Sequence, residues 1–482
     1  MSAHGRYLAA LRRTLHLSTP GANLSVEVGG ALVARSGGLT ARKLLLQVPP
    51  RHVVTVQEAL GAAGSVINRC ALKLPKTLPR HFVLGVFVLY ERHAGRKDGL
   101  WRLWLESLPP LDNATFFWSD EQLQQLEEER AIKRSRELRR VLHDEYRTMV
   151  RVLLDEGLDD DMPDGVEIGV GEYMWAVGVV MRYAWHFGPD FPVLVPLALR
   201  QHPEGNAVVV EWGNETDPGA SLYVSEHAPR ALPPGAEVTA WAESADPLEQ
   251  LLHAGHVWDA LPLASLRLHF SAGGLKSAET PGGGGRTARG EGRRKELLAA
   301  AQWSTQMDFE LAHRELNPEL LAWLRLVLAT DAELAAAATH AAFDEPDAVS
   351  ADTERRVWNA LLYTLESSLG AYDFDVEEDE EWLRASERSA RTSAAPASSA
   401  SLTAAHRKHI AVTYRRLCKR VLLRNQEMAS AALKVAHARR RHRPADSATP
   451  VSVAVSPTGE ATTEPTRKRT ATRKKKRRKK VQ

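Results

Sequence analysis

The chain is poor in cysteine and has no long apolar run. Cys70 and Cys418 are the two cysteines among 482 residues, which excludes a disulfide scaffold and suits a reducing compartment. No uninterrupted apolar stretch reaches the length that a membrane span needs. We therefore expect no membrane partner.

Sequence motifs of several common catalytic sites are also missing. The histidines show neither His-Glu-x-x-His nor His-x-His spacing, so no metal ligands are predicted. The segment GGGGRTARGEG lacks the Gly-Lys-Ser/Thr ending of a phosphate-binding loop. This segment is predicted to belong to a linker rather than to a nucleotide site.

The composition, 44% hydrophobic and 26% charged, is typical of globular domains, and the length allows two of them. A glycine-rich linker at 271–293 is predicted to divide the chain. After it, Asn317 followed by Pro318 and Glu319 predicts the start of a helix. Amphipathic helices are predicted at 7–17, 316–337, 354–372 and 402–438, and strands at 44–48 and 53–56.

A helical insert is predicted at about 119–190. Apolar residues recur with helical spacing at 121–154 and 172–185, and Ser119 suits the N-cap of the first helix. Trp175, Met181, Trp185 and Trp212 are interpreted as packing residues.

The segment Pro234–Gly255 combines a turn, an apolar strand and a helix that ends in His-x-Gly. Its frame residues are Gly235, Val238, Trp241, Glu249, His253 and Gly255. This frame resembles the end of the SET domain in the RuBisCO large-subunit lysine methyltransferase class, which also contains the actin-histidine methyltransferase.

Three positions inside this frame differ from the class in chemical type. Ala242 stands where the class has Tyr, Glu243 where it has Gly, and Pro247 where it has Asn. In the class, the Tyr hydroxyl orients the acceptor amine, and alanine has no group that donates or accepts a hydrogen bond. The resemblance therefore implies no confident catalytic residue here.

A second segment of the class leads from a Pro-Leu pair into an Asn-His run. Val193–Asn206 contains Pro196-Leu197, has Gln201 where Asn is expected, and retains His202. The third segment is the N-terminal glycine loop, for which Val26–Arg35 is the candidate. Gly29 fits the first glycine of that loop, whereas Ala31 replaces the second. By resemblance, the residues that would bind S-adenosylmethionine are Gly29, Gln201 and His202.

The resemblance covers most of the chain and implies an α+β fold. We expect a β-rich SET-like domain at 1–270 with the helical insert, then the linker, then an all-α substrate-binding-type domain at 294–443. That helical domain would dock a protein substrate or partner. Within it, the acidic run 373–383 is predicted to be a solvated face or loop, and 384–401 a disordered loop.

The last segment, 444–482, is predicted to be a disordered basic tail. Arg467–Lys480 carries eleven positive charges and no acid. The tail has a net charge of +8, so the rest of the chain contributes −5 to the total of +3. Such a run is typical of a nuclear or nucleolar localisation signal or of an arm that binds nucleic-acid phosphates. An Arg-containing, acid-free N-terminus leaves the mitochondrion as an alternative compartment, beside the cytoplasm.

Two hypotheses for the function remain open. The first is a divergent SET protein with weak or absent activity that retains the fold in order to bind a protein. The second is an active protein-lysine, or protein-histidine, N-methyltransferase in which Tyr173, Tyr183 or Tyr223 supplies the missing hydroxyl. Binding of S-adenosylmethionine would separate the two hypotheses.

Overall fold

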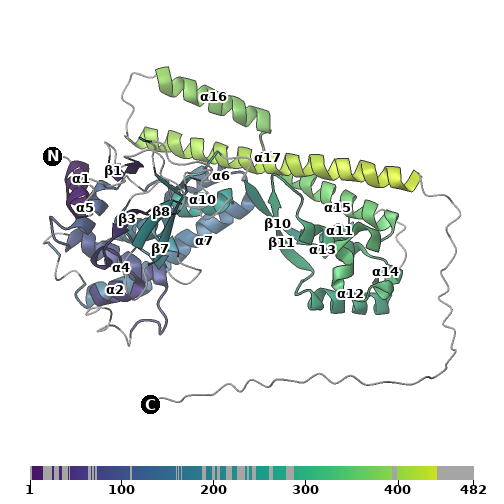
Figure 1. Cartoon of the computed structure of the whole chain (residues 1–482), viewed down its shortest axis with the longest axis horizontal. Coiled ribbons are helices and arrows are strands. Elements are labelled where there is room, and N and C mark those ends of the chain that lie inside the picture. The colour runs from purple at the N-terminus through teal and green to yellow at the C-terminus, as the bar shows by residue number, and fades with distance from the viewer. Residues whose placement is uncertain are drawn as a thin grey trace, which may run out of the picture.

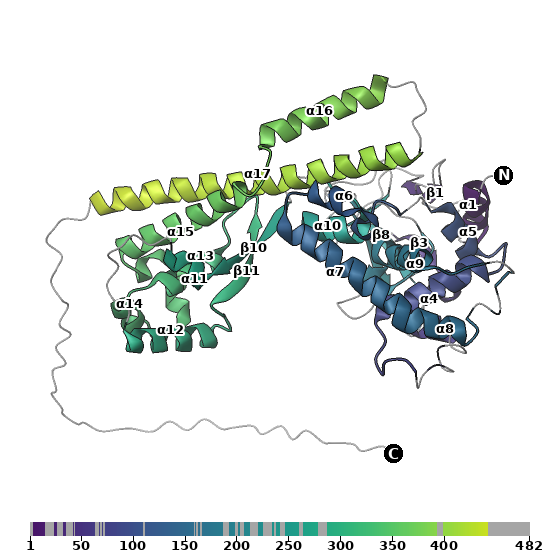
Figure 2. The same ribbon diagram turned by 180° about the vertical axis from the view of Figure 1, so that it is seen from behind.

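The structure is a computed structural model, and Figures 1 and 2 show it from opposite sides. It describes residues 3–14, 24–26, 32–34, 42, 44–62, 67, 70, 73–108, 111–158, 160, 162–163, 166–186, 192–197, 201–202, 207–212, 220–224, 234–235, 238–241, 246–259, 264–277, 287–392 and 399–441. The basic tail predicted at 444–482 lies outside these residues.

The N-terminal body consists of helices packed around small sheets (Figure 1). The helices α4 and α9 pack closely against each other, and α1 packs on α5. The α-helices are α1 (Ala3–Thr14), α2 (Val56–Ala62), α4 (Arg80–His93), α5 (Leu100–Ser107), α6 (Asp120–Gln124), α7 (Glu129–Glu145), α8 (Arg151–Asp155), α9 (Val170–Tyr183) and α10 (Pro247–Ala254). Short 3₁₀ helices cover Pro50–His52 and Thr115–Phe117.

A mixed five-stranded sheet lies in this body, with the strand order β3-β8-β7-β9-β6. The pairs β3–β8 and β8–β7 are antiparallel, whereas β9 runs parallel to both β7 and β6. Two-stranded antiparallel sheets are formed by β1 with β2 and by β4 with β5. The strands are β1 (Leu24–Val26), β2 (Leu32–Ala34), β3 (Leu44–Val48), β4 (Trp185–His186), β5 (Pro192–Val193), β6 (Gln201–His202), β7 (Ala207–Trp212), β8 (Ala220–Val224) and β9 (Thr239–Trp241).

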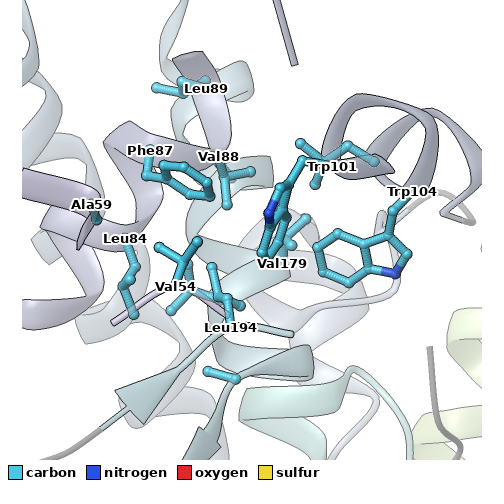
Figure 3. Packing of buried hydrophobic residues seen from close by; sticks show 14 of the residues in the cluster. Val54, Ala59, Leu84, Phe87, Val88, Leu89, Trp101, Trp104, Val179 and Leu194 are labelled. Carbon is cyan, nitrogen blue, oxygen red and sulfur yellow. The ribbon is translucent and has the colours of Figure 1, made fainter. Parts of the chain in front are cut away.

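The core of this body is rich in aromatic and branched side chains (Figure 3). Phe87 of α4 meets Trp101 of α5 edge-on with ring centroids 5.3 Å apart, and Trp101 meets Trp104 at 5.5 Å. Burial of α4 on several sides explains its nearly continuous apolar sequence.

The helical insert forms as predicted. Ser119 is the N-cap of α6, and its side chain accepts a hydrogen bond from the backbone of Gln122 in a capping box. From Glu129 the chain continues through α7, a π-helical turn at Tyr146–Val150, and α8 without a break, and α9 follows. Trp175, Met181 and Trp185 pack against the first core, as expected, whereas the Trp212 side chain lies outside the described residues.

The linker predicted at 271–293 is largely wrong. Ser271 ends strand β10 (Ser265–Ser271), α11 (Ala272–Ser277) follows, and α12 begins at Ala288. Strand β10 pairs in antiparallel register with β11 (Gln306–Ala312), so the two sides of the supposed linker are joined by a ladder. The glycine-rich composition predicted an extended linker. Its first residue, Ser271, is instead the end of β10, because it pairs with Gln306 of β11, 35 residues later.

The C-terminal body is mainly helical and is joined to the β10–β11 pair. Asn317 caps α13 with Pro318 at the first turn, as predicted. The helices are α12 (Ala288–Ala300), α13 (Pro318–Leu328), α14 (Asp331–Ala336), α15 (Ala351–Leu369), α16 (Val376–Thr392) and α17 (Ser399–Arg441), with 3₁₀ helices at His340–Asp344 and Pro346–Ala348.

The second core crosses the predicted domain boundary. Leu123 of α6 and Leu251 of α10 are fully buried in the same cluster as Trp323 of α13 and Leu417 of α17. The long helix α17 accordingly runs over both bodies (Figures 1 and 2). The two parts of the chain therefore pack as connected bodies rather than as separate ones.

The helix α16 corrects the loop predicted at 384–401, whereas most acidic side chains of the run 373–383 are exposed, as expected for a solvated face. This helix covers Val376–Thr392 and lies along α17 (Figure 2). Within the run, Asp379 is fully buried, and its carboxylate pairs with Arg415 and Lys419, both 2.5 Å away. The disordered loop predicted at 384–401 is helical at 384–392 and 399–401, and the remaining residues lie outside the described part.

Both cysteines are buried and unbridged. Within the described ranges, no helix combines the length and the apolar character required to cross a membrane.

Candidate functional site

Two of the three segments singled out in the sequence are neighbours in the five-stranded sheet. Strand β6 pairs in parallel with β9, so that Gln201 lies opposite Ala240 and His202 opposite Trp241. Neighbouring strands lie about 4.8 Å apart. Strand β9 ends at Trp241, directly before Ala242 in the chain. Ala242, Glu243 and the side chains of Gln201 and His202 lie outside the described residues.

The third segment reaches the same place through the β1–β2 pair. Val26 pairs with Leu32, so Gly29 belongs to the connection between the two strands, although Gly29 itself lies outside the described residues. The backbone N–H of Gly235 donates a hydrogen bond to the carbonyl oxygen of Ala34 at 2.8 Å. Gly235 has φ +76°, a conformation that favours glycine and suits the turn before β9.

The Pro196-Leu197 pair is held from two directions. The buried hydroxyl of Tyr7, on α1, donates to the carbonyl oxygen of Pro196 at 3.0 Å. Leu194 and Val54 exchange both backbone hydrogen bonds at 2.9 Å, and both side chains lie in the first core (Figure 3). These contacts position the chain as it enters β6.

The helix α10 follows β9 and matches the helix predicted within Pro234–Gly255. Asp246 is the N-cap, and its carboxylate accepts a hydrogen bond from Leu248 N at 2.8 Å. Pro247 occupies the first turn, where its missing N–H costs nothing. The residue that replaces the Asn of the class thus has a structural role as a helix starter. Sequence reasoning overlooked Asp246, although an Asp directly before a Pro signals a helix start.

Gly255 ends α10 in the left-handed region, with φ +59°. A Cβ at this position would lie 2.7 Å from the backbone nitrogen of Ala114. Gly255 is therefore needed both for its backbone conformation and for the close approach of the 113–114 chain.

Comparison with known proteins gives the same picture. Residues 292–422 match the Rubisco LSMT substrate-binding family. The ribulose-1,5-bisphosphate carboxylase/oxygenase large subunit N-methyltransferase of Pisum sativum is 26% identical over 188 residues, a match that covers 37% of this chain and 36% of the relative. The chain thus matches only about a third of the length of that curated relative.

Solved structures extend the likeness to most of the chain. Rubisco LSMT bound to sinefungin and monomethyllysine has a TM-score of 0.64 at 20% identity, over 90% of this chain and 93% of the other. The SET domain of LSMT bound to lysine and AdoHcy has a TM-score of 0.63 at 19% identity, over 91% and 94%.

The chain has the fold of the Rubisco LSMT structures, and its residues 292–422 match the substrate-binding family of that class. The predicted class, and the predicted fold of a SET domain with a helical insert followed by a helical substrate-binding-type domain, are confirmed. The assignment of Gly29, Gln201 and His202 to cofactor binding stays a prediction.

Three tyrosines of this SET protein are candidates to replace the missing hydroxyl. The Tyr173 hydroxyl is buried and donates to Glu145 Oε2 at 2.6 Å, and burial together with the Glu145 charge raises the pKa of Tyr173. Tyr223 lies on β8, which β7 separates from β9, so its backbone is two strands away from β9. These two tyrosines are therefore poor substitutes.

Tyr183 differs from the other two. It ends α9, packs edge-on against Trp104 with ring centroids 5.7 Å apart, and has its pKa raised by burial. Its hydroxyl has no hydrogen-bond partner among the residues that the structure describes. Of the three tyrosines, Tyr183 is thus the one whose hydroxyl is not held by a described residue and is not placed two strands away from β9.

His253, which the class places before the exit glycine, is half-exposed on α10. Its Nε2 lies 3.5 Å from Glu249. It also lines a pocket of about 300 Å³ whose other walls are mainly apolar side chains of α7 and α9. The same pocket is lined by His81, whose Nε2 is 2.8 Å from Glu145. In the described part of the chain, no group of three or more His, Cys, Asp and Glu side chains is arranged to hold a metal ion.

Proposed function

We propose that this chain is a divergent SET protein with weak or absent methyl transfer, which uses its fold to bind a protein. The observation that carries the proposal is the chemistry at the end of β9. Ala242 follows Trp241 where the class has its Tyr, and Tyr173 and Tyr223 are not available to replace that hydroxyl. Loss of one oriented hydrogen-bond donor typically lowers the rate by about 10²–10³.

The backbone brings together the three segments that the resemblance assigns to S-adenosylmethionine binding. The pairing of β6 with β9, and the hydrogen bond between Gly235 and Ala34, bring the flanks of all three segments together. Gly29, Gln201 and His202 are the residues that would hold the cofactor, and the cofactor supplies the transferred methyl group when it is bound. Structures of Rubisco LSMT contain AdoMet, AdoHcy, lysine or monomethyllysine, which supports this choice of ligand.

The proposed protein-binding role rests on the C-terminal body. Residues 292–422 match a substrate-binding family, and α17 connects this body to the SET part through α6 and α10. A partner bound to the helical body would therefore lie on an element that also contacts the SET part. The partner would be a protein.

An active methyltransferase is the second candidate function. It is favoured by Tyr183, whose hydroxyl has no partner among the described residues. Methyl transfer to a neutral amine depends largely on alignment, so one well-placed hydroxyl could be sufficient.

Calorimetric titration with S-adenosylmethionine tests the proposal, together with methylation of cellular protein extracts. We expect weak or undetectable cofactor binding and no labelled protein above background. The paired change Ala242→Tyr and Glu243→Gly should strengthen binding, because it restores the two side chains of the class. His269→Ala is a suitable control, since His269 is exposed on β10 and pairs with Asp308 at 2.9 Å. Methylation that is abolished in His202→Ala but retained in His269→Ala would overturn the proposal and favour the active enzyme.

We also propose that Arg467–Lys480 directs the chain to the nucleus or nucleolus or contacts nucleic acid there. Its eleven cations have no acid among them, which supports contact with a polyanion. Deletion of this segment should abolish nuclear enrichment or weaken the salt dependence of DNA binding. The slope of log K against log salt concentration should become less steep by roughly 0.9 for each phosphate that the segment neutralises in the natural chain. Unchanged localisation and unchanged salt dependence would refute this role.

A further inference from the structure

A groove lies between α6, α16 and the first half of α17. Its volume is about 580 Å³. Phe374, Trp382 and Val412 contribute apolar surface to it, and Phe374 is 48% exposed, which is unusual for a large aromatic side chain. The groove thus offers a partly exposed apolar surface, although the guanidinium of Arg415 lies 4.8 Å from the centre of the Phe374 ring.

Acidic side chains line the same groove. Glu121, Asp373, Glu378 and Glu381 are all exposed, and none of them forms an ion pair with a described residue. An apolar surface bordered by unpaired carboxylates is complementary to a segment rich in Lys and Arg, whose aliphatic stems pack while their charges pair.

Three cations of α17 near the groove are already paired with other acids, whereas Lys408, which also lines the groove, forms no ion pair with a described residue. Arg415 pairs with Asp379 and also with Glu127. Lys419 pairs with Asp379, and Arg420 pairs with Glu380. The negative charge at the groove is therefore not offset by these three residues.

The aromatic wall already accepts a cation. The ammonium of Lys408 lies 5.0 Å from the centre of the Trp382 ring. A cation over an aromatic face is attracted by the ring quadrupole. Trp382 can therefore contribute to the binding of a basic segment beyond simple charge attraction.

The chain itself contains a segment of matching chemistry. Arg467–Lys480 carries eleven cations, whereas the chain before residue 444 has a net charge of −5. From the end of α17 at Arg441 back to Val412 in the groove, the helix spans 29 residues, or about 44 Å at 1.5 Å per residue. The 25 residues between Arg441 and Arg467 can span up to about 85 Å. The basic segment can therefore reach the groove of its own chain.

We propose that Arg467–Lys480 binds in cis in the groove formed by α6, α16 and α17. In that state the basic segment shields the carboxylates, and it is released when the groove or the segment meets a stronger partner. This inference goes beyond the function proposed above and does not depend on methyl transfer or on cofactor binding.

The test uses a fluorescent peptide with the sequence of Arg467–Lys480 and two full-length proteins. One is the natural chain, and the other has all eleven Lys and Arg residues of the segment changed to Gln. Fluorescence anisotropy should show the peptide binding to the charge-neutral chain. The natural chain should bind the peptide at least about tenfold more weakly, because its own segment competes at a high effective concentration.

Charge-removing variants made in the charge-neutral chain then locate the site. Asp373→Asn, Glu378→Gln and Glu381→Gln together should weaken peptide binding at least about tenfold, since three carboxylates of the groove are neutralised. A matched control removes the same charge elsewhere on the helical body, through the exposed residues Glu315→Gln, Glu345→Gln and Asp347→Asn. We expect the control to bind the peptide as the parent chain does.

Three results would overturn the proposal. Equal weakening in both triple variants would mean that the peptide senses only the overall charge. Equal peptide affinity for the natural and the charge-neutral chains would mean that the segment does not occupy the groove. The single reversal Glu381→Lys serves as an independent check if the groove triple variant is unfolded by circular dichroism. If the natural chain competes with the peptide more strongly as the protein concentration rises, the segment of one chain binds the groove of another, and binding in cis is refuted.

Discussion

Asp379 is expected to hold α16 on α17. Its side chain is fully buried, and it contacts the guanidinium of Arg415 and the ammonium of Lys419, which are themselves 8% and 3% exposed. The change Asp379→Asn keeps the size of the side chain but removes its charge. Buried Lys419 would then have no ion-pair partner among the described residues, and Arg415 would keep only Glu127, which is costly at low dielectric.

The magnitude follows from what else anchors the helix. Val376 and Leu383 are the buried apolar side chains of α16 among those described, and each contributes about 1.5–3 kcal/mol. Loss of one partner from a buried ion pair costs about 3–5 kcal/mol. This cost is comparable to the apolar contribution, so α16 should detach from α17 for a substantial fraction of the time.

Hydrogen exchange measured by mass spectrometry is the suitable assay, because it reports on α16 separately from the rest of the chain. A detached helix of this length is only marginally stable in water, so its amides exchange whenever it leaves α17. Since 1.4 kcal/mol corresponds to a factor of ten, exchange in α16 should accelerate by about 10²–10³ in Asp379→Asn.

Glu380→Gln is the matched control. Glu380 is next to Asp379, but it pairs with Arg420, which is 42% exposed, so its loss should cost at most about 1 kcal/mol. Adding Lys419→Met to Asp379→Asn should restore part of the protection, because it removes the cation that has lost its anion. Equal exchange in Asp379→Asn and Glu380→Gln would refute the view that the buried pair holds α16.

Three further predictions follow from single contacts. Gly255→Ala should destabilise the chain to urea by about 1–3 kcal/mol, because φ is +59° and the new Cβ would meet Ala114 N; unchanged stability would show that the loop can move. Tyr173→Phe should cost about 1–3 kcal/mol by the same assay, since buried Glu145 would be deprived of a donor, and a neutral result would contradict that role. Burial raises the pKa of Glu333, but hydrogen bonds from two backbone N–H groups lower it overall. The contribution of the Glu333 carboxylate to stability should therefore be present above about pH 4.5 and disappear as the pH falls through the lowered pKa. Glu333→Gln should reduce this loss of stability in acid, measured by unfolding at different pH values.

Elements that depend on local chemistry were predictable from the residues alone. The caps Ser119 and Asn317, and the helices that follow them, form as predicted because a cap and an apolar period involve residues within a few turns of each other. The residues and order of the three motif segments, together with the amphipathic helices after residue 316, predicted the SET fold and the helical body after it.

Which residues lie together, and which are buried, depends on long-range packing. The acidic run looked solvated, yet Asp379 is buried because Arg415, 36 residues later, supplies its counter-charge. Ser271 looked like the start of a linker, yet it is the end of a strand, since Gln306 pairs with it. The approach of His202 to Trp241 likewise arises from a parallel pairing between distant segments. Such contacts depend on partners far away in the chain, and local composition and periodicity carry no information about them.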